Sequence, residues 1–313
     1  MRIKGEKNMN KLLTETILNY IKVKKVVLKT STIARYFNLY ENHIKDYFEQ
    51  TTINQVTNKS LQEYVDNQIN KGITSIVIRE AILLIKLSLK REAKFGEIKM
   101  PYVDLDIPEN KKVKRVETLS QIEEKIIINH IFNNDRKKYS GVILSLFTGM
   151  RIGEICALKW ADIDLKKRQI IVNKTLQRIC VKNQKSIIEI GHTKTISANR
   201  TIPISNLLYD FLMAIKPANR NYYFLTNNIK PNEPRNYRKI YKTMLKKLNI
   251  KSTTFHALRH TFATRLIENK IDIKTISELL GHASTNITIS IYVHSEYNTK
   301  KKAIKTLDKL FLK

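Results

Sequence analysis

The pattern of apolar residues changes once along this chain, at an aperiodic stretch between residues 100 and 120. Before that stretch, three segments place apolar side chains three and four residues apart, the spacing of an amphipathic helix: 11–28, 30–50 and 75–96. The last segment carries one apolar stripe, formed by Ile78, Ile82, Ile85 and Leu89. The pattern predicts a small helical domain over residues 1–105.

The second part of the chain mixes helical and strand patterns. Helices are predicted over 119–132, with its start at Ser120, and over 140–150 and 151–160. Strands are predicted over 168–179, 186–196 and 199–205, and the chain is mostly helical again from residue 206. The predicted fold class is therefore mainly α with a small antiparallel β-sheet (α+β), and the second domain covers residues 118–313.

The aperiodic stretch "MPYVDLDIPENKKVKRVETLS" has the composition of an interdomain linker. It holds two prolines and a dense cluster of cations. We assign the linker to residues 106–117, and its basic cluster consists of Lys111, Lys112, Lys114 and Arg115.

Positive charge is in large excess, because 57 lysines and arginines stand against 28 aspartates and glutamates, a net charge of +29. Residues 1–110 hold 18 basic and 13 acidic residues, whereas residues 111–313 hold 39 and 15. Such an excess indicates a polyanionic partner, most often nucleic acid, although a genome biased toward lysine is an alternative explanation.

Membrane insertion and secretion have no support in the sequence. No run approaches the roughly 18 to 20 apolar residues that a membrane span requires, and the first residues lack the apolar core of a signal peptide. Cys156 and Cys180 lack metal-binding spacing and suit a reducing cytoplasm, so both are expected to be inert packing residues. The expected location is the cytoplasm, in association with the nucleoid.

Cationic side chains gather on one helix late in the chain, "TFHALRHTFATRLIE" at residues 254–268. His256, Arg259 and His260 fall within an arc of about 100°, while Phe255, Leu258, Phe262 and Leu266 lie opposite. One face is expected to be core and the other to be chemistry or surface.

Three further basic residues and one tyrosine extend this set. Arg151 follows the Thr148-Gly149 break at a helix start, where backbone N–H groups favour an anion. Lys194 lies in or beside a strand turn, His282 follows the helix terminator Gly281, and Tyr292 lies ten residues further on. Each has an ordinary explanation alone. Together they suit chemistry at a phosphodiester, because guanidinium groups clamp phosphate oxygens and a phenol can act as a nucleophile.

Four stretches of this sequence resemble the tyrosine recombinases, also called the phage integrase family. They are "TGMRIGEICALKW", "TKTISANRTIPI", "HALRHTFATRLIE" and "LLGHASTNITISIYVH", and they follow one another in the family's order across most of residues 118–313. The helical residues 1–110 look like the family's SAM-like core-binding domain. The resemblance implies an integrase-like catalytic domain and a site-specific recombinase that cleaves and rejoins DNA strands.

The resemblance also implies the role of each residue. Tyr292 would attack the scissile phosphate and form a 3′-phosphotyrosyl link, while Arg151 and Arg259 hold the phosphate. Lys194 would protonate the departing 5′-oxygen. His256 would manage the phenol proton, His282 would supply another phosphate contact, and Glu154 would support the arginine helix. His260 is explained equally well by packing or by a structural hydrogen bond.

This chemistry implies no metal and no cofactor, because the tyrosyl ester conserves the bond energy of the phosphodiester. The sequence has neither a phosphate-binding loop nor clustered carboxylates for two metal ions. The expected partner is double-stranded DNA with core-type recombination sites, contacted in part by the linker cations Lys111, Lys112, Lys114 and Arg115.

The resemblance further implies assembly into a homotetramer on DNA. Ile304, Leu307, Leu310 and Phe311 form an apolar stripe in the tail helix near the chain end, which would dock on a neighbouring copy or fold back on its own domain. A directionality factor is a possible further partner, and a separate amino-terminal arm-binding domain is expected to be lacking.

Two alternative functions remain open at this point. A type IB topoisomerase shares the phosphotyrosine chemistry, although the tail stripe and the "LLGHAS" motif favour a recombinase. A catalytically silent, sequence-specific DNA-binding accessory protein is disfavoured because each expected reactive position is filled.

Overall fold

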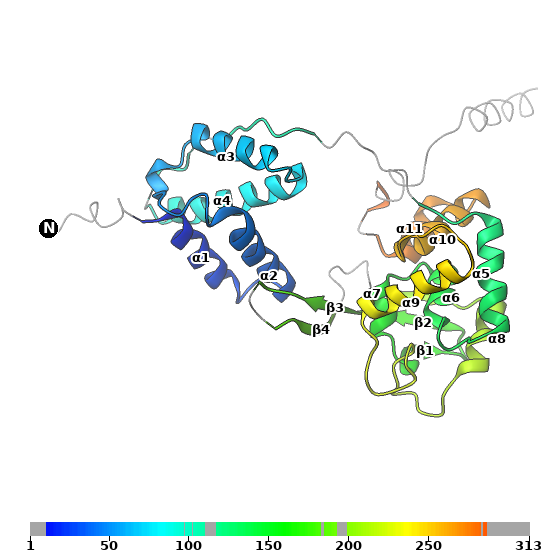
Figure 1. Cartoon of the computed structure of the whole chain (residues 1–313). Helices are drawn as coiled ribbons and strands as arrows, with labels where there is room; N and C mark the ends of the chain where they lie inside the picture. The colour runs from blue at the N-terminus through cyan, green and yellow to red at the C-terminus, as the bar shows by residue number, and fades with distance from the viewer. Residues whose placement is uncertain are drawn as a thin grey trace, which may run out of the picture. The chain divides into compact units, whose positions relative to one another are not determined.

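The computed structural model describes residues 11–96, 98–101, 103–109, 117–182, 185–192, 199–282 and 284–286 (Figure 1). The chain divides into two compact units. The amino-terminal unit comprises Met1–Lys114 with Ile179–Ile187, and the carboxyl-terminal unit comprises Arg115–Arg178 with Ile188–Lys313. The linker cations, Lys194, Tyr292 and the tail stripe all lie outside the described residues.

Four α-helices build the amino-terminal unit: α1 (Leu13–Lys24), α2 (Thr30–Leu39), α3 (Asn58–Asn70) and α4 (Ser75–Lys94). A π-helical turn η2 (Tyr40–Ile44) and a 3-10 turn η3 (Ile53–Gln55) connect α2 to α3. The predicted stripe on α4 is confirmed as core, because all four of its side chains are buried against Leu13, Ile17 and Leu61. Helical spacing thus predicted α1, α2 and α4, whereas α3 lies outside the three predicted segments.

The segment after α4 packs along the same unit. Val103, Leu105 and Ile107 are partly buried against its core. The Asp106 N–H donates to the Gln62 side chain at 2.9 Å, and Arg79 donates to the Ile107 carbonyl at 2.8 Å. These contacts explain why a stretch without periodicity still has a defined path, since extended backbone is satisfied here by side chains from α3 and α4.

The carboxyl-terminal unit contains seven α-helices in its described part: α5 (Gln121–Asn133), α6 (Ser140–Thr148), α7 (Ile152–Ala157), α8 (Asn206–Ile215), α9 (Pro234–Lys247), α10 (His256–Glu268) and α11 (Ile273–Leu280). The predicted helix start at Ser120 is confirmed, because Ser120 and Glu123 form a reciprocal capping box. The helix predicted over 151–160 is shorter than expected, since α7 ends at Ala157 and a 3-10 turn η4 (Trp160–Asp162) follows.

Helix α6 is the centre of this unit. Nearly all its side chains are buried, including Val142, Ile143 and Leu144. Helices α5, α7, α8 and α10 pack around it. The two helices that carry the predicted arginines, α7 and α10, are thereby fixed to one rigid element.

The strands form two sheets instead of the single small sheet expected. Strands β1 (Ile163–Asp164), β2 (Gln169–Val172) and β5 (Arg200–Pro203) make one antiparallel sheet, with Val172 opposite Arg200. Strands β3 (Lys174–Ile179) and β4 (Ile187–His192) make another. The strand predicted over 168–179 is therefore two strands, because the ladder with β5 ends at Val172 and the chain leaves it at Asn173.

The two cysteines differ in environment. Cys156 is buried on α7, whereas Cys180 is exposed. The expectation that both are packing residues is wrong for Cys180, because it follows the end of β3 and contributes nothing to a core. None of the described helices is long and apolar enough to span a bilayer.

Candidate active site

The turn between α6 and α7 requires a glycine. Gly149 ends α6 with φ of 65°, in the left-handed region, and its N–H donates to the Ser145 carbonyl. A Cβ atom at this position would lie 2.6 Å from Phe262 Cδ1 and 2.8 Å from Leu280 Cδ2. The absent side chain therefore lets α10 and α11 approach the turn that leads to Arg151.

We expect Gly149→Ala to lower the free energy of unfolding by about 3 kcal/mol, because alanine adds both backbone strain and an overlap with Phe262. Gly72→Ala is the matched control, since Gly72 has φ of 73° but nothing within 4 Å of a Cβ atom. It should cost only about 1 kcal/mol. Urea unfolding of each variant measures the difference, and equal losses would mean that the close approach is unimportant.

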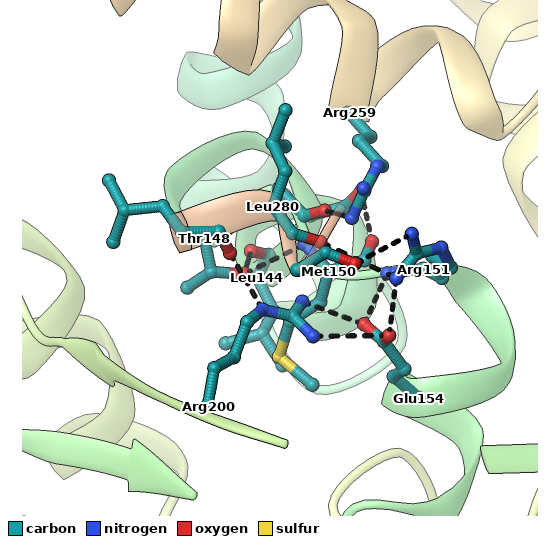
Figure 2. A network of polar contacts seen from close by, with 12 residues as sticks. Leu144, Thr148, Met150, Arg151, Glu154, Arg200, Arg259 and Leu280 are labelled. Carbon is teal, nitrogen blue, oxygen red and sulfur yellow. Dashed lines mark hydrogen bonds and ion pairs between the residues drawn. The ribbon is translucent and has the colours of Figure 1, made fainter. Parts of the chain in front are cut away.

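Glu154 binds two arginines at once. Its carboxylate accepts from the Arg151 backbone N–H and from Arg151 Nη1, both at 2.9 Å. The same carboxylate accepts from Arg200 Nη1 at 3.2 Å and from Arg200 Nη2 at 2.8 Å (Figure 2). Glu154 is only 3% exposed, so it joins α7 to strand β5 as a buried, doubly paired charge.

The paired arginines keep Glu154 ionised. Burial is the largest single influence and raises the pKa of the carboxyl group. The hydrogen bonds and the charge of Arg200, followed by those of Arg151, act in the opposite direction and prevail, so the pKa of Glu154 lies below its ordinary value. The carboxylate is therefore a fixed negative charge at neutral pH.

The carboxyl end of α11 lies against the same group. Arg200 Nε donates to the Leu279 carbonyl at 2.6 Å. Arg151 donates to the Leu280 carbonyl at 3.4 Å and to the Gly281 carbonyl at 3.3 Å (Figure 2). Cations are stabilising at a helix carboxyl terminus, where the last carbonyls have no partner within the helix. These contacts bring His282, the next residue, to the arginine cluster.

Arg259 lies on the face of α10 that was expected to be chemistry or surface, and it is buried. Only 1% of the residue is exposed, and Nη1 donates to the Gly149 carbonyl at 2.8 Å. Phe255, which precedes α10, and Leu258 within it are also buried. Of the two uses expected for this face of α10, chemistry or surface, the surface is ruled out at Arg259, because the helix is enclosed on that side as well.

Three histidine rings lie close to these arginines. His256 and His260 meet edge to face on α10, with ring centroids 4.5 Å apart. Desolvation, followed by the positive charge of His260, Arg259 and Arg151, lowers the pKa of His256 to about 4. Desolvation and the charges of Arg259 and Arg151 likewise lower the pKa of His282 to about 4. Both rings are therefore neutral at pH 7 and able to accept a proton or a hydrogen bond.

His260 has the same protonation state. Desolvation and the charge of Arg259 lower the pKa of His260 to about 4. Its neutral ring packs against His256. This ring contact supports a structural role for His260.

Sequence reasoning missed Arg200, which shares Glu154 with Arg151. Strand β5 offered a signal, because Arg200 has the same alternating phase as the buried residues Ile202 and Ile204. An arginine on the inward face of an amphipathic strand needs a buried acceptor. The sequence contains that arginine but not the identity of its partner.

The structure thus brings together five of the predicted site residues: Arg151, Glu154, His256, Arg259 and His282. Lys194 and Tyr292 lie outside the described residues. Within the described part of the chain, no group of three or more histidine, cysteine, aspartate or glutamate side chains is arranged to hold a metal ion.

Both parts of the chain match models of known protein families. Residues 115–299 match the model of the phage integrase family, and residues 12–68 match the N-terminal SAM-like domain of phage integrases. The chain belongs to the phage integrase family. It is therefore a member of the tyrosine recombinases, a family of site-specific recombinase enzymes, and the topoisomerase alternative gains no support.

Two relatives illustrate the similarity. The tyrosine recombinase XerC-like protein of Caldanaerobacter subterraneus subsp. tengcongensis is 29% identical, over 91% of this chain and 79% of its own. The integrase of Staphylococcus phage L54a is 26% identical, over 90% of this chain and 88% of its own. The similarity of both relatives extends well beyond the catalytic motifs.

Solved integrase structures share the fold. The Tn1549 transposon integrase, in complex with transposon right end DNA, superposes with a TM-score of 0.79 at 23% identity and covers 95% of this chain and 99% of its own. A lambda integrase dimer bound to a COC′ core site gives a TM-score of 0.64 at 18% identity, covering 93% and 82%. The predicted fold class, mainly α with small antiparallel sheets, is confirmed.

Proposed function

We propose that this chain recombines double-stranded DNA at core-type sites through a 3′-phosphotyrosyl intermediate. One observation carries the proposal: Arg259 donates to the Gly149 carbonyl, two residues before Arg151, and Arg151 donates to the Leu280 and Gly281 carbonyls, next to His282. A phosphodiester is the group that such a cationic cluster stabilises best as negative charge develops. The DNA complexes of the Tn1549 and lambda integrases support DNA as the substrate.

The proposed reaction is a transesterification at one backbone phosphate. The phenol oxygen of Tyr292 bonds to phosphorus while the bond to the 5′-oxygen breaks, and Arg151, Arg259 and His282 hold the phosphate. His256 accepts the phenol proton, which is needed because an ordinary tyrosine titrates near pH 10. Lys194 gives a proton to the departing 5′-oxygen. Attack by a second strand's 5′-hydroxyl reverses these steps and releases the tyrosine.

Further partners belong to the same proposal. Four copies would act together on two DNA segments at the nucleoid, linked through the tail stripe around Leu307 and Leu310. The linker cations around Lys112 would contact the phosphate backbone. A directionality factor would choose between integration and excision.

A nicked duplex tests the proposal. Sites are first selected from a pool of random duplexes by binding to the protein, and nicks are then moved stepwise across the selected site. Cleavage beside a nick releases a short oligonucleotide and traps the ester. We expect an adduct that resists detergent, a peptide map that assigns it to Tyr292, and a 5′-hydroxyl on the released fragment.

Other outcomes would contradict the proposal. Specific binding without an adduct at any nick position indicates the accessory protein. Relaxation of supercoiled DNA that lacks the selected site indicates a topoisomerase. The intact duplex is the control, because religation should keep its adduct scarce.

The three histidine rings provide a pH test. In the absence of DNA we expect NMR titration midpoints near pH 4 for His256, His260 and His282, whereas an unfolded histidine titrates near about 6.5. The unfolded chain therefore binds more protons between these values, and the stability of the protein should fall as pH falls from about 6.5 to about 4. Bound DNA should raise the pKa of His282, because phosphate favours the charged ring. A midpoint at 6.5 or above without DNA would contradict the neutral site.

A further inference from the structure

Two arginines hold the carboxyl end of α11, and they differ in access to solvent. The Arg151 side chain is 37% exposed, whereas the Arg200 side chain is 6% exposed. Both also contact Glu154, whose side chain is 2% exposed. Arg200 also differs in its contacts, because all three of its guanidinium nitrogens donate to Glu154 or to the Leu279 carbonyl.

The guanidinium of Arg200 is fixed by contacts on two elements. Its two terminal nitrogens donate to Glu154 on α7, and Nε donates to the Leu279 carbonyl on α11. Because the group is planar, these contacts set the orientation of α7 and the α11 end together. Lysine has one nitrogen and could not satisfy both in the same geometry.

Arg200 also changes the charge balance around Arg151. A buried carboxylate paired with one guanidinium would hold that cation tightly as a neutral pair. Here Glu154 is shared, because Arg200 donates to both of its oxygens and Arg151 donates to the same carboxylate. One negative charge therefore faces two guanidinium groups, and a net positive charge remains beside Arg151 for a phosphate.

The end of α11 determines the position of His282. Gly281 adopts φ of 64°, and the His282 N–H turns back to donate to the Ser277 carbonyl at 3.1 Å. The backbone of His282 is thus part of the helix cap. Holding the Leu279 carbonyl in place therefore holds His282 as well.

We propose that Arg200 is a positioning residue for strand cleavage, which aligns Arg151 and His282 on the same phosphate through Glu154 and the carboxyl end of α11. The inference rests on the proposed function, since it concerns the same reaction. In this role Arg200 acts through Glu154 and the Leu279 carbonyl, to which it donates.

Arg200→Lys tests this role, because lysine keeps the positive charge and removes the planar fork. Arg200→Gln is the stronger variant, and the lysine variant decides the matter if glutamine prevents folding. Arg178→Lys is the matched control: Arg178 is also a strand arginine with two bonds to one glutamate, Glu233, at 2.7 Å each. Thermal unfolding establishes that every variant is folded at the assay temperature.

Two measurements are made on each variant. Single-turnover adduct formation on the nicked duplex should fall about 100-fold for Arg200→Lys, because a displacement near 1 Å has such an effect. Duplex affinity should be unchanged. Hydrogen exchange at the Gly281 and His282 amides should accelerate about tenfold while amides in α10 keep their rates, because the α11 end opens locally. Arg178→Lys should change neither quantity.

Each result decides the inference. Normal cleavage by Arg200→Lys overturns it, and so does slow cleavage with unchanged exchange at His282, which would indicate a direct contact with DNA. If the wild-type protein forms no adduct, the proposed function fails. The exchange measurement then still decides whether Arg200 positions His282, because unchanged exchange overturns that role without reference to cleavage.

Discussion

Tyr292→Phe should lose covalent attachment to the nicked duplex entirely, with duplex binding unchanged. The variant removes one oxygen atom, the atom that forms the ester with phosphorus in the proposed reaction. Binding depends on cations elsewhere in the chain, so it should persist. Removal of a nucleophile costs at least about 10⁴-fold in comparable enzymes, which puts the adduct below detection on a denaturing gel.

Tyr209→Phe is the matched control for this variant. Tyr209 lies on α8, and its ring stacks on the Arg168 guanidinium at 4.4 Å, a contact that phenylalanine keeps. It should form the adduct at the wild-type rate. An adduct that survives in Tyr292→Phe would remove Tyr292 from the reaction and require another nucleophile.

Glu154→Ala should destabilise the carboxyl-terminal unit by about 3–5 kcal/mol, the usual result of removing one partner from a buried ion pair. The variant leaves the Arg200 side chain, only 6% exposed, without the carboxylate that it contacts through two nitrogens. It also removes the carboxylate that orients the Arg151 backbone and side chain. Scanning calorimetry should record a loss of about 10 °C in the melting temperature of this unit.

Glu233→Ala is the matched control, which tests whether the loss of stability in Glu154→Ala depends on the burial of the ion pair. Glu233 binds Arg178 with equally short bonds, but the Arg178 side chain is 33% exposed. Solvent can replace the lost partner, so the cost should stay below about 1 kcal/mol. Similar losses for both variants would mean that the buried position of Glu154 contributes nothing to stability.

Local sequence patterns predicted the helices whose burial or start depends on residues close together in the sequence. The stripe on α4 is buried as predicted, and Ser120 caps α5 as predicted, because apolar spacing and a capping box act within a few residues. The strand over 168–179 was predicted wrongly because its extent depends on a residue segment that is distant in the sequence. Its division at Asn173 depends on β5, which lies about thirty residues further along the chain.

In the candidate site, too, some features were predicted from the sequence and others depend on the tertiary structure. Four motifs identified the family and supplied Arg151, Glu154, His256, Arg259 and His282, because the chemistry of a phosphodiester dictates the residue types. Their spacing along the chain carries no information on burial, so the face of Arg259 was expected to be chemistry or surface, and only the structure shows that it is enclosed.

The sequence by itself determined the family, the fold class and the kind of chemistry, since these depend on the identity and order of residues. Only the tertiary structure decided that Arg200 shares Glu154 with Arg151 and holds the carboxyl end of α11. That arrangement joins three elements that are distant in sequence. Its cause is the need of a buried charge for a partner, and the partner is chosen by packing rather than by any local pattern.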